Sequence, residues 1–142
     1  MTQEAMATST AVINAEPAAV WQVLTDPERL SRAFFGAKVE TDWRVGSPIT
    51  FTGEWDGKTF QDKGEILAVE PGRMLRFTHF SPLSGQPDVP ENYHTLTFDL
   101  TPADRRTELT ISQSNAGSAE EREHSEANWA KMLDTIKQLA GR

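Results

Sequence analysis

One long amphipathic helix at the end of a strand-rich chain limits the possible folds more than any other feature. In the segment NWAKMLDTIKQLAG (residues 128–141) apolar side chains recur every three or four residues, with polar side chains between them. This apolar stripe consists of Trp129, Met132, Leu133, Ile136, Leu139 and Ala140. Almost everything between residues 39 and 114 instead has the pattern of β-strands. The helix must therefore bury its stripe against a sheet.

The strand-rich region has the pattern of an antiparallel meander. Apolar and polar residues alternate in SPITFTGEW, and the following Asp56-Gly57 pair favours a two-residue hairpin turn. The next strand, about residues 59–70, does not alternate cleanly, which predicts a β-bulge. A proline-rich loop over residues 81–92 interrupts the meander. The remaining candidate strands are residues 73–80, 94–100 and 107–113.

The segments on either side of the meander contain start signals for helices. A short strand, STAVINA, precedes Pro17 and the Asp26-Pro27 pair, each of which is typical of the first turn of a helix. These two starts predict a short helical hairpin. Ser118 and Glu121 have the spacing of a capping box, which predicts the start of the long helix. We expect residues 1–8 to form a disordered tail and residues 9–142 to form a single domain.

The order of these elements predicts an α+β fold. We expect a curved antiparallel sheet of about six to seven strands, wrapped around the long C-terminal helix, with the helical hairpin after the first strand. Burial of Trp129, Leu133 and Ile136 would stabilise the fold by about 1.5–3 kcal/mol each. A strongly twisted sheet cannot touch one helix along its whole length. Any gap left between them would be an apolar pocket.

The composition excludes several classes of partner. The 142 residues carry a net charge of −7 and have a pI of about 4.9, whereas binding to nucleic acid or to anionic lipid needs clustered Lys and Arg. No apolar run approaches membrane-spanning length, and the first residues lack the basic start of a signal peptide. We therefore expect a cytoplasmic protein without a nucleic-acid partner or membrane insertion.

The sequence offers little to hold a metal ion or cofactor. The absence of cysteine excludes disulfides, thiolate metal sites and a thiol nucleophile. The sequence has no HExxH motif, and the third histidine, His124, falls at the acidic start of the long helix, where we expect it to face water. Motifs for phosphate loops, dinucleotide binding and serine hydrolases are missing as well. We expect no metal, no cofactor and no assigned catalytic residue.

Several segments together resemble a known superfamily. They are AVWQVLTDPERLSRAFF, GEILAVEPGRMLRFTH, NYHTLTFDLTP and NWAKMLDTIKQL. Their order and spacing are similar to those of the SRPBCC (START-like, helix-grip) superfamily, in the branch named for the activator of heat-shock-protein-90 ATPase, over residues 9–141. The resemblance implies a helix-grip fold with a hydrophobic cavity of the kind that often binds lipids, hormones or polyketide-like aromatics. It does not imply a co-chaperone role, because full-length co-chaperones of that type carry a separate N-terminal domain that this sequence does not show.

Two histidines are the most informative polar residues. His79 and His94 bracket the proline-rich loop, and each falls on an apolar strand face, so antiparallel pairing would bring them together. One interpretation is a pair of polar contacts inside the pocket, or an acid–base pair for a bound ligand. The other is a pair of hydrogen-bonded structural histidines near the edge of the sheet.

The candidate ligand-binding residues are those expected between the sheet and the helix, although plain core packing would also explain the apolar ones. They are Phe34, Phe51, Trp55, Phe77, His79, His94, Leu96, Trp129, Met132, Leu133 and Ile136. The preferred function is non-enzymatic binding of a small hydrophobic molecule by a monomer or homodimer. The alternative is a cyclase, aromatase or hydrolase that acts on a polyketide-like substrate, with His79 or His94 as the base.

Overall fold

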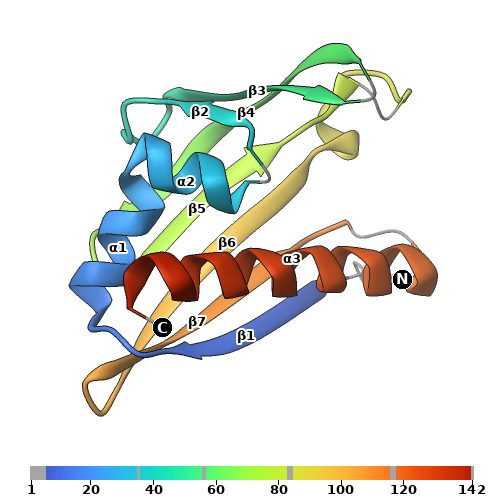
Figure 1. Cartoon of the computed structure of the whole chain (residues 1–142). Coiled ribbons are helices and arrows are strands. Elements are labelled where there is room, and N and C mark those ends of the chain that lie inside the picture. The colour runs from blue at the N-terminus through green and yellow to red at the C-terminus, as the bar shows by residue number, and fades with distance from the viewer. Residues whose placement is uncertain (1–5, 35, 56, 83–84, 116–117, 142) are drawn as a thin grey trace.

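An antiparallel sheet that curves around one long helix dominates the molecule (Figure 1). The computed structural model describes residues 6–34, 36–55, 57–82, 85–115 and 118–141, and within them the sheet has seven strands in the order β1-β7-β6-β5-β4-β3-β2. The elements are β1 (Ala7–Ile13), α1 (Pro17–Thr25), α2 (Pro27–Ala33), β2 (Lys38–Glu40), β3 (Pro48–Trp55), β4 (Lys58–Glu70), β5 (Met74–His79), the 3₁₀ turn η2 (Pro90–Asn92), β6 (His94–Ala103), β7 (Arg106–Gln113) and α3 (Ala119–Ala140). The predicted α+β helix-grip fold is confirmed.

Two-residue connections join two pairs of neighbouring strands, one of them at the expected Asp56-Gly57 position. Trp55 pairs with Lys58, so only two residues connect β3 to β4; of these, Asp56 lies outside the described residues and Gly57 has a φ of 76°. β6 and β7 are also joined by two residues, Asp104 and Arg105, both with positive φ as a type I′ turn requires. β1 then pairs with β7, and the sheet is complete.

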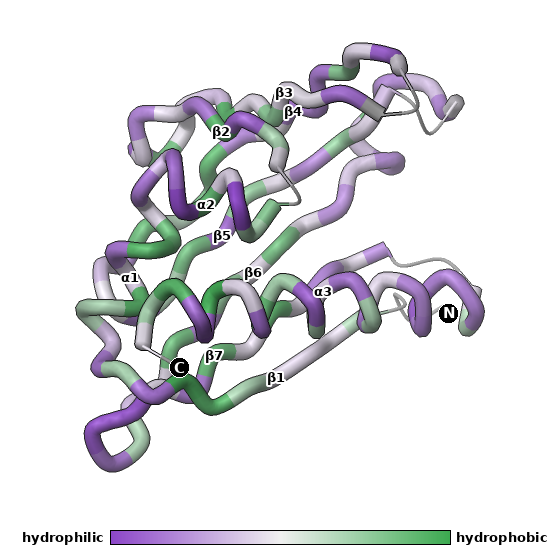
Figure 2. The backbone as a smooth tube through the Cα atoms, in the orientation of Figure 1, coloured by the Kyte–Doolittle hydropathy of each residue, from purple (hydrophilic) through white to green (hydrophobic). Residues whose placement is uncertain are grey.

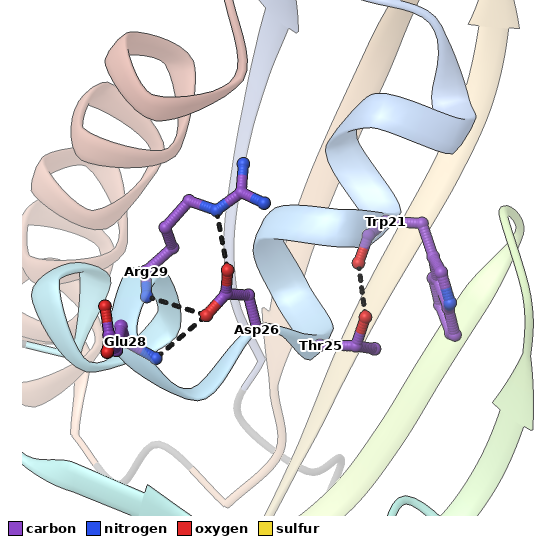
Figure 3. A network of polar contacts seen from close by, with 5 residues as sticks. All are labelled: Trp21, Thr25, Asp26, Glu28 and Arg29. Carbon is purple, nitrogen blue, oxygen red and sulfur yellow. Dashed lines mark hydrogen bonds and ion pairs between the residues drawn. The ribbon is translucent and has the colours of Figure 1, made fainter.

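The junction between α1 and α2 is held by side chains of the first turn of α2 (Figure 3). The Asp26 carboxylate accepts hydrogen bonds from the backbone N–H groups of Glu28 (3.0 Å) and Arg29 (3.5 Å), and it meets Arg29 Nε at 2.9 Å. The hydrogen bond from the Arg29 side chain is the main reason that the pKa of Asp26 lies below its usual value. The predicted cap at Asp26-Pro27 is therefore confirmed.

The first strand begins earlier than the sequence suggested. The tail was expected to end at residue 8, whereas β1 begins at Ala7, which is fully buried and lies opposite Gln113. The Thr8 N–H donates to the Glu126 carboxylate at 3.0 Å, and the Ser9 hydroxyl donates to the Glu126 carbonyl at 2.9 Å. Backbone pairing and these bonds to α3 order the segment. The start of β1 was not predicted because the small polar side chains there do not alternate with large apolar ones.

Only the middle of the apolar stripe on α3 is fully buried in the core. Met132, Leu133 and Ile136 are buried, and the helix packs mainly on β1, α1 and α2. Trp129, expected in the core, is only half-buried. Figure 2 shows that hydrophobic residues gather around α1 and the C-terminal half of α3, while the first turns of α3 are hydrophilic. The core therefore fills the space between the sheet and the C-terminal half of α3. Among the described residues, no helix is both long and apolar enough to cross a membrane.

The predicted bulge in β4 is confirmed, and a glycine beside it allows two strands to approach very closely. The register between β4 and β5 shifts between Ile66 and Ala68. At Gly64, an added Cβ would lie 1.7 Å from the Thr78 carbonyl oxygen. Only a residue without a side chain fits there. The close approach brings the end of β5, which carries His79, next to the inner face of β4.

We expect Gly64→Ala to destabilise the protein by about 1–3 kcal/mol or more, because the obstacle to the new methyl group is backbone and cannot rotate away. Gly53→Ala is the matched control in the same sheet. Its Cβ would lie 2.8 Å from Phe60 Cζ, the far end of a side chain that can move, so its loss should be smaller. Urea unfolding gives both values. Equal stability of Gly64→Ala and wild type would contradict the close approach.

Candidate functional site

A hollow of about 410 Å³ lies between the sheet and the first half of α3. We call it the sheet–helix pocket. Its lining comes from five places: Phe34, Gly36 and Ala37 between α2 and β2; Phe51, Gly53 and Glu54 on β3; Phe60 and Asp62 on β4; His79 on β5; and Asn128 and Trp129 on α3. It occupies the end of the sheet that the core leaves unfilled.

Aromatic rings form the inner wall of the pocket. The Phe34 and Phe51 rings are tilted against one another with their centroids 5.0 Å apart, and both side chains are almost completely buried. Behind them Phe77 lies 5.7 Å from Phe51 and stacks on Phe98 at 5.7 Å. The wall is therefore continuous with the core. Rings packed on both sides cannot collapse into the hollow, which makes the apolar surface preformed.

A carboxylate and an imidazole face this aromatic wall. Asp62 lies directly opposite Phe51 in the β3–β4 pairing, so both side chains are on the inner face of the sheet. His79 Nε2 meets Asp62 Oδ2 at 2.9 Å, and the His79 ring packs edge-on against Phe51 with the centroids 5.2 Å apart. The His79 side chain is only 23% exposed and the Asp62 side chain only 13%.

The two Asp62 oxygens have different surroundings. Oδ2 has His79 as its partner, whereas Oδ1 is buried and has no hydrogen-bond partner among the described residues. With His79 neutral, its Nε2–H donates to Asp62 and its Nδ1 is left as an acceptor. A buried carboxylate oxygen without a partner costs free energy, which is unusual in a region with only a structural role.

The candidate residues predicted from the sequence fall into separate groups. Phe34, Phe51, His79 and Trp129 line the pocket. Phe77, Leu96, Met132, Leu133 and Ile136 are packed in the core behind it, with at most 2% of their surface exposed. The side chain of Trp55 lies outside the described part of the structure.

His94, the last candidate, lines a different hollow. His79 and His94 are directly opposite in the β5–β6 pairing, as the sequence suggested. Their rings, however, have different partners. His94 Nδ1 is 3.1 Å from the Ser114 carbonyl oxygen and 3.2 Å from Gln113 Nε2, and the ring borders a hollow near the start of α3 that also includes His124. Among the described residues, no cluster of three or more potential ligands could hold a metal ion.

A hydrogen-bonded chain fixes the helix side of the pocket and connects it to His94. The Trp129 indole Nε1–H donates to Gln113 Oε1 at 2.9 Å. This bond determines the orientation of the Gln113 amide, so its NH₂ group faces His94. Gln113 is only 6% exposed and belongs to β7, so the indole is attached to the sheet as well as to its own helix.

Sequence reasoning missed Phe60, Asp62, Glu54 and Asn128. The signal for the first two was present, because alternation in KTFQDKGE places Phe60 and Asp62 on one face of β4. A carboxylate on an apolar face is the kind of exception that indicates a site. Asn128 carried no such signal, because its role depends on how α3 lies over the sheet.

A larger hollow of about 660 Å³ lies between α2 and β2, but its lining does not suit an apolar ligand. The described lining residues are Pro27, Glu28, Ser31, Arg32, Lys38, Val39, Glu40 and Thr41, and none of them is aromatic. Arg32, Lys38 and Glu40 are all exposed, so this surface is solvated. The sheet–helix pocket is therefore the better candidate.

We expect Trp129→Phe to destabilise the protein by about 1–3 kcal/mol, because it leaves the buried Gln113 oxygen without its donor. The double variant Trp129→Phe/Gln113→Leu removes both partners and should lose less than the sum of the two single variants. Urea unfolding of all four proteins completes the cycle. Strict additivity would show that the indole–amide bond contributes nothing.

Comparison with known proteins places this geometry in context. The model of the family described as activator of Hsp90 ATPase homolog 1-like protein matches residues 14–141. No curated protein matches the chain. Among solved structures, a protein from Cytophaga hutchinsonii is 42% identical with a TM-score of 0.85, and the match covers 97% of this chain and 94% of that one.

Two more distant structures share the fold alone. The Aha1 dimer from Colwellia psychrerythraea is 18% identical with a TM-score of 0.73, over 96% of each chain. DynU16, a protein of the dynemicin biosynthetic locus, is 21% identical with a TM-score of 0.76, over 94% of this chain and 46% of that one.

Proposed function

We propose that this chain, which belongs to the activator of Hsp90 ATPase homolog 1-like family of the SRPBCC superfamily, binds a small hydrophobic molecule in the sheet–helix pocket. The observation that carries the proposal is the preformed aromatic hollow between sheet and helix. Its volume of about 410 Å³ falls within the range of small-molecule sites, which is roughly 300–1,000 Å³.

The distribution of polar groups supports a small molecule. Ligand pockets are mostly apolar, with a few polar groups that fix the orientation of the ligand. Here the rings of Phe34, Phe51 and Phe60 supply apolar surface, while Asp62, His79 and Asn128 supply the polar groups. The family name alone does not bring a co-chaperone role to this chain. A concave aromatic hollow of this size suits a small molecule better than the surface of a folded partner.

Nile red, a neutral dye whose fluorescence rises in apolar surroundings, tests this proposal. We expect wild-type protein to bind it and Asn128→Trp to bind it at least about tenfold more weakly, because the larger ring fills the helix side of the pocket. Ala130→Trp is the matched control, since Ala130 is an exposed residue of the same helix. It should bind like wild type. Unchanged binding by a folded Asn128→Trp protein would place the dye elsewhere.

An enzymatic function has one specific observation in its favour. The Asp62 carboxylate holds His79 at 2.9 Å, and a neutral His79 then has Nδ1 available to take a proton from a ligand in the pocket or from a water molecule that attacks it. Hydrolysis of 4-nitrophenyl butyrate that is lost in a folded His79→Gln protein would support this alternative. Native mass spectrometry of freshly purified protein separates the two functions further, because a retained and unmodified ligand favours binding.

A further inference from the structure

We infer that the ligand of the sheet–helix pocket is an organic cation, that is, an apolar body that carries an amine or a quaternary ammonium group. The inference rests on the proposed function and names its ligand class. Three features of the pocket lead to it: the charges of its lining, the unpartnered oxygen of Asp62, and the aromatic rings of its wall.

The charged side chains of the pocket favour a positive ligand. The described lining contains two acidic residues, Asp62 with its side chain on the inner face of the sheet and the exposed Glu54 at its edge, and neither Lys nor Arg. Lys63, the basic residue next to Asp62 in the sequence, lines a separate hollow where it forms an ion pair with Asp88. Apart from the His79 imidazole, its hydrogen-bond partner at 2.9 Å, Asp62 has no basic side chain near it in the described lining. A fatty acid would add another negative charge beside Asp62, whereas a cation would supply a counter-charge.

The negative charge of Asp62 would interact more strongly with a ligand cation than the charge of a surface residue, because Asp62 is largely buried. Its side chain is 13% exposed, and Oδ1 is buried without a partner among the described residues. Electrostatic interactions are stronger where water is excluded. A ligand cation would therefore offset a desolvation cost that the protein bears when the pocket is empty.

The aromatic wall favours the same sign of charge. The π-faces of aromatic rings carry partial negative charge and attract ammonium groups, and clusters of such rings bind quaternary ammonium ligands. Phe34, Phe51, Phe60 and Trp129 all line the pocket. A neutral apolar ligand would use these rings for their surface alone. A cation would use both the rings and the Asp62 carboxylate.

Three naphthalene compounds of matched size test the inference by displacement of Nile red. They are 2-naphthylmethyl-trimethylammonium, 2-naphthalenemethanol and 2-naphthoate. We expect affinity to fall in that order, with the cation binding on the order of tenfold or more tightly than the carboxylate. A carboxylate that binds as tightly as the cation overturns the inference but leaves the proposed function standing. A wild-type protein that binds no Nile red would overturn both.

Two variants with the same change in net charge locate the origin of the preference. Asp62→Asn should remove most of the difference between cation and carboxylate while leaving the affinity for the neutral alcohol nearly unchanged. Glu65→Gln is the control, because Glu65 is an exposed residue of β4 that lines the separate hollow with Lys63. It should keep the preference. Equal effects of the two variants would attribute the preference to overall charge and overturn the role of the pocket.

A third variant keeps the test independent of the folding of Asp62→Asn. Glu54 is exposed at the mouth of the pocket, so Glu54→Gln should fold normally and weaken the preference by a smaller factor. Should Asp62→Asn fail to fold, the three compounds on wild type and on Glu54→Gln still decide the question. A preference for the carboxylate in wild type, or a preference for the cation that grows in Glu54→Gln, would contradict the inference.

Discussion

Burial of Met132, Leu133 and Ile136 in the second half of α3 is the contact on which the rest of the structure depends. α3 has 22 residues, about 33 Å of helix, but its apolar stripe begins only at Trp129. The preceding turns carry Glu120, Glu121 and Glu123, which remain exposed. The helix therefore closes one end of the curved sheet tightly, together with α1 and α2, and leaves the other end open. The pocket lies where the apolar stripe begins, at Trp129.

The pocket also depends on an unusual contact between two strands. The missing side chain of Gly64 lets the Thr78 carbonyl lie against β4, and His79 follows directly and reaches Asp62. A regular β4–β5 pairing with a side chain at position 64 would keep these strands farther apart. The cost of burying Asp62 is only partly offset by the bond to His79, because one of its oxygens has no partner in the described structure. Asp62 therefore affects both the stability of the fold and the proposed binding of a cation.

Trp129 connects the pocket to the rest of the sheet. Its indole forms part of the pocket wall, and its Nε1–H is bound to Gln113 on β7, which in turn contacts His94. His94 Nδ1 can accept from Gln113 or donate to the Ser114 carbonyl, but one nitrogen cannot do both at once. Because His79 contacts Asp62 whereas His94 contacts Gln113 and Ser114, the two histidines have separate roles. His79 belongs to the pocket itself, and His94 supports the residue that holds the pocket wall.

The sequence alone determined the three helices, the strands other than β2 and their order, because those depend on local signals. The period of α3, the cap at Asp26, the two-residue connection between β3 and β4 and the bulge in β4 are each encoded within a few neighbouring residues. The partial burial of Trp129, the separation of His94 from His79 and the presence of Asp62 in the pocket were decided by the tertiary structure. They depend on the curvature of the sheet, on the close approach at Gly64 and on where α3 leaves the core. Such features arise from contacts between residues far apart in the chain, and no local pattern records them.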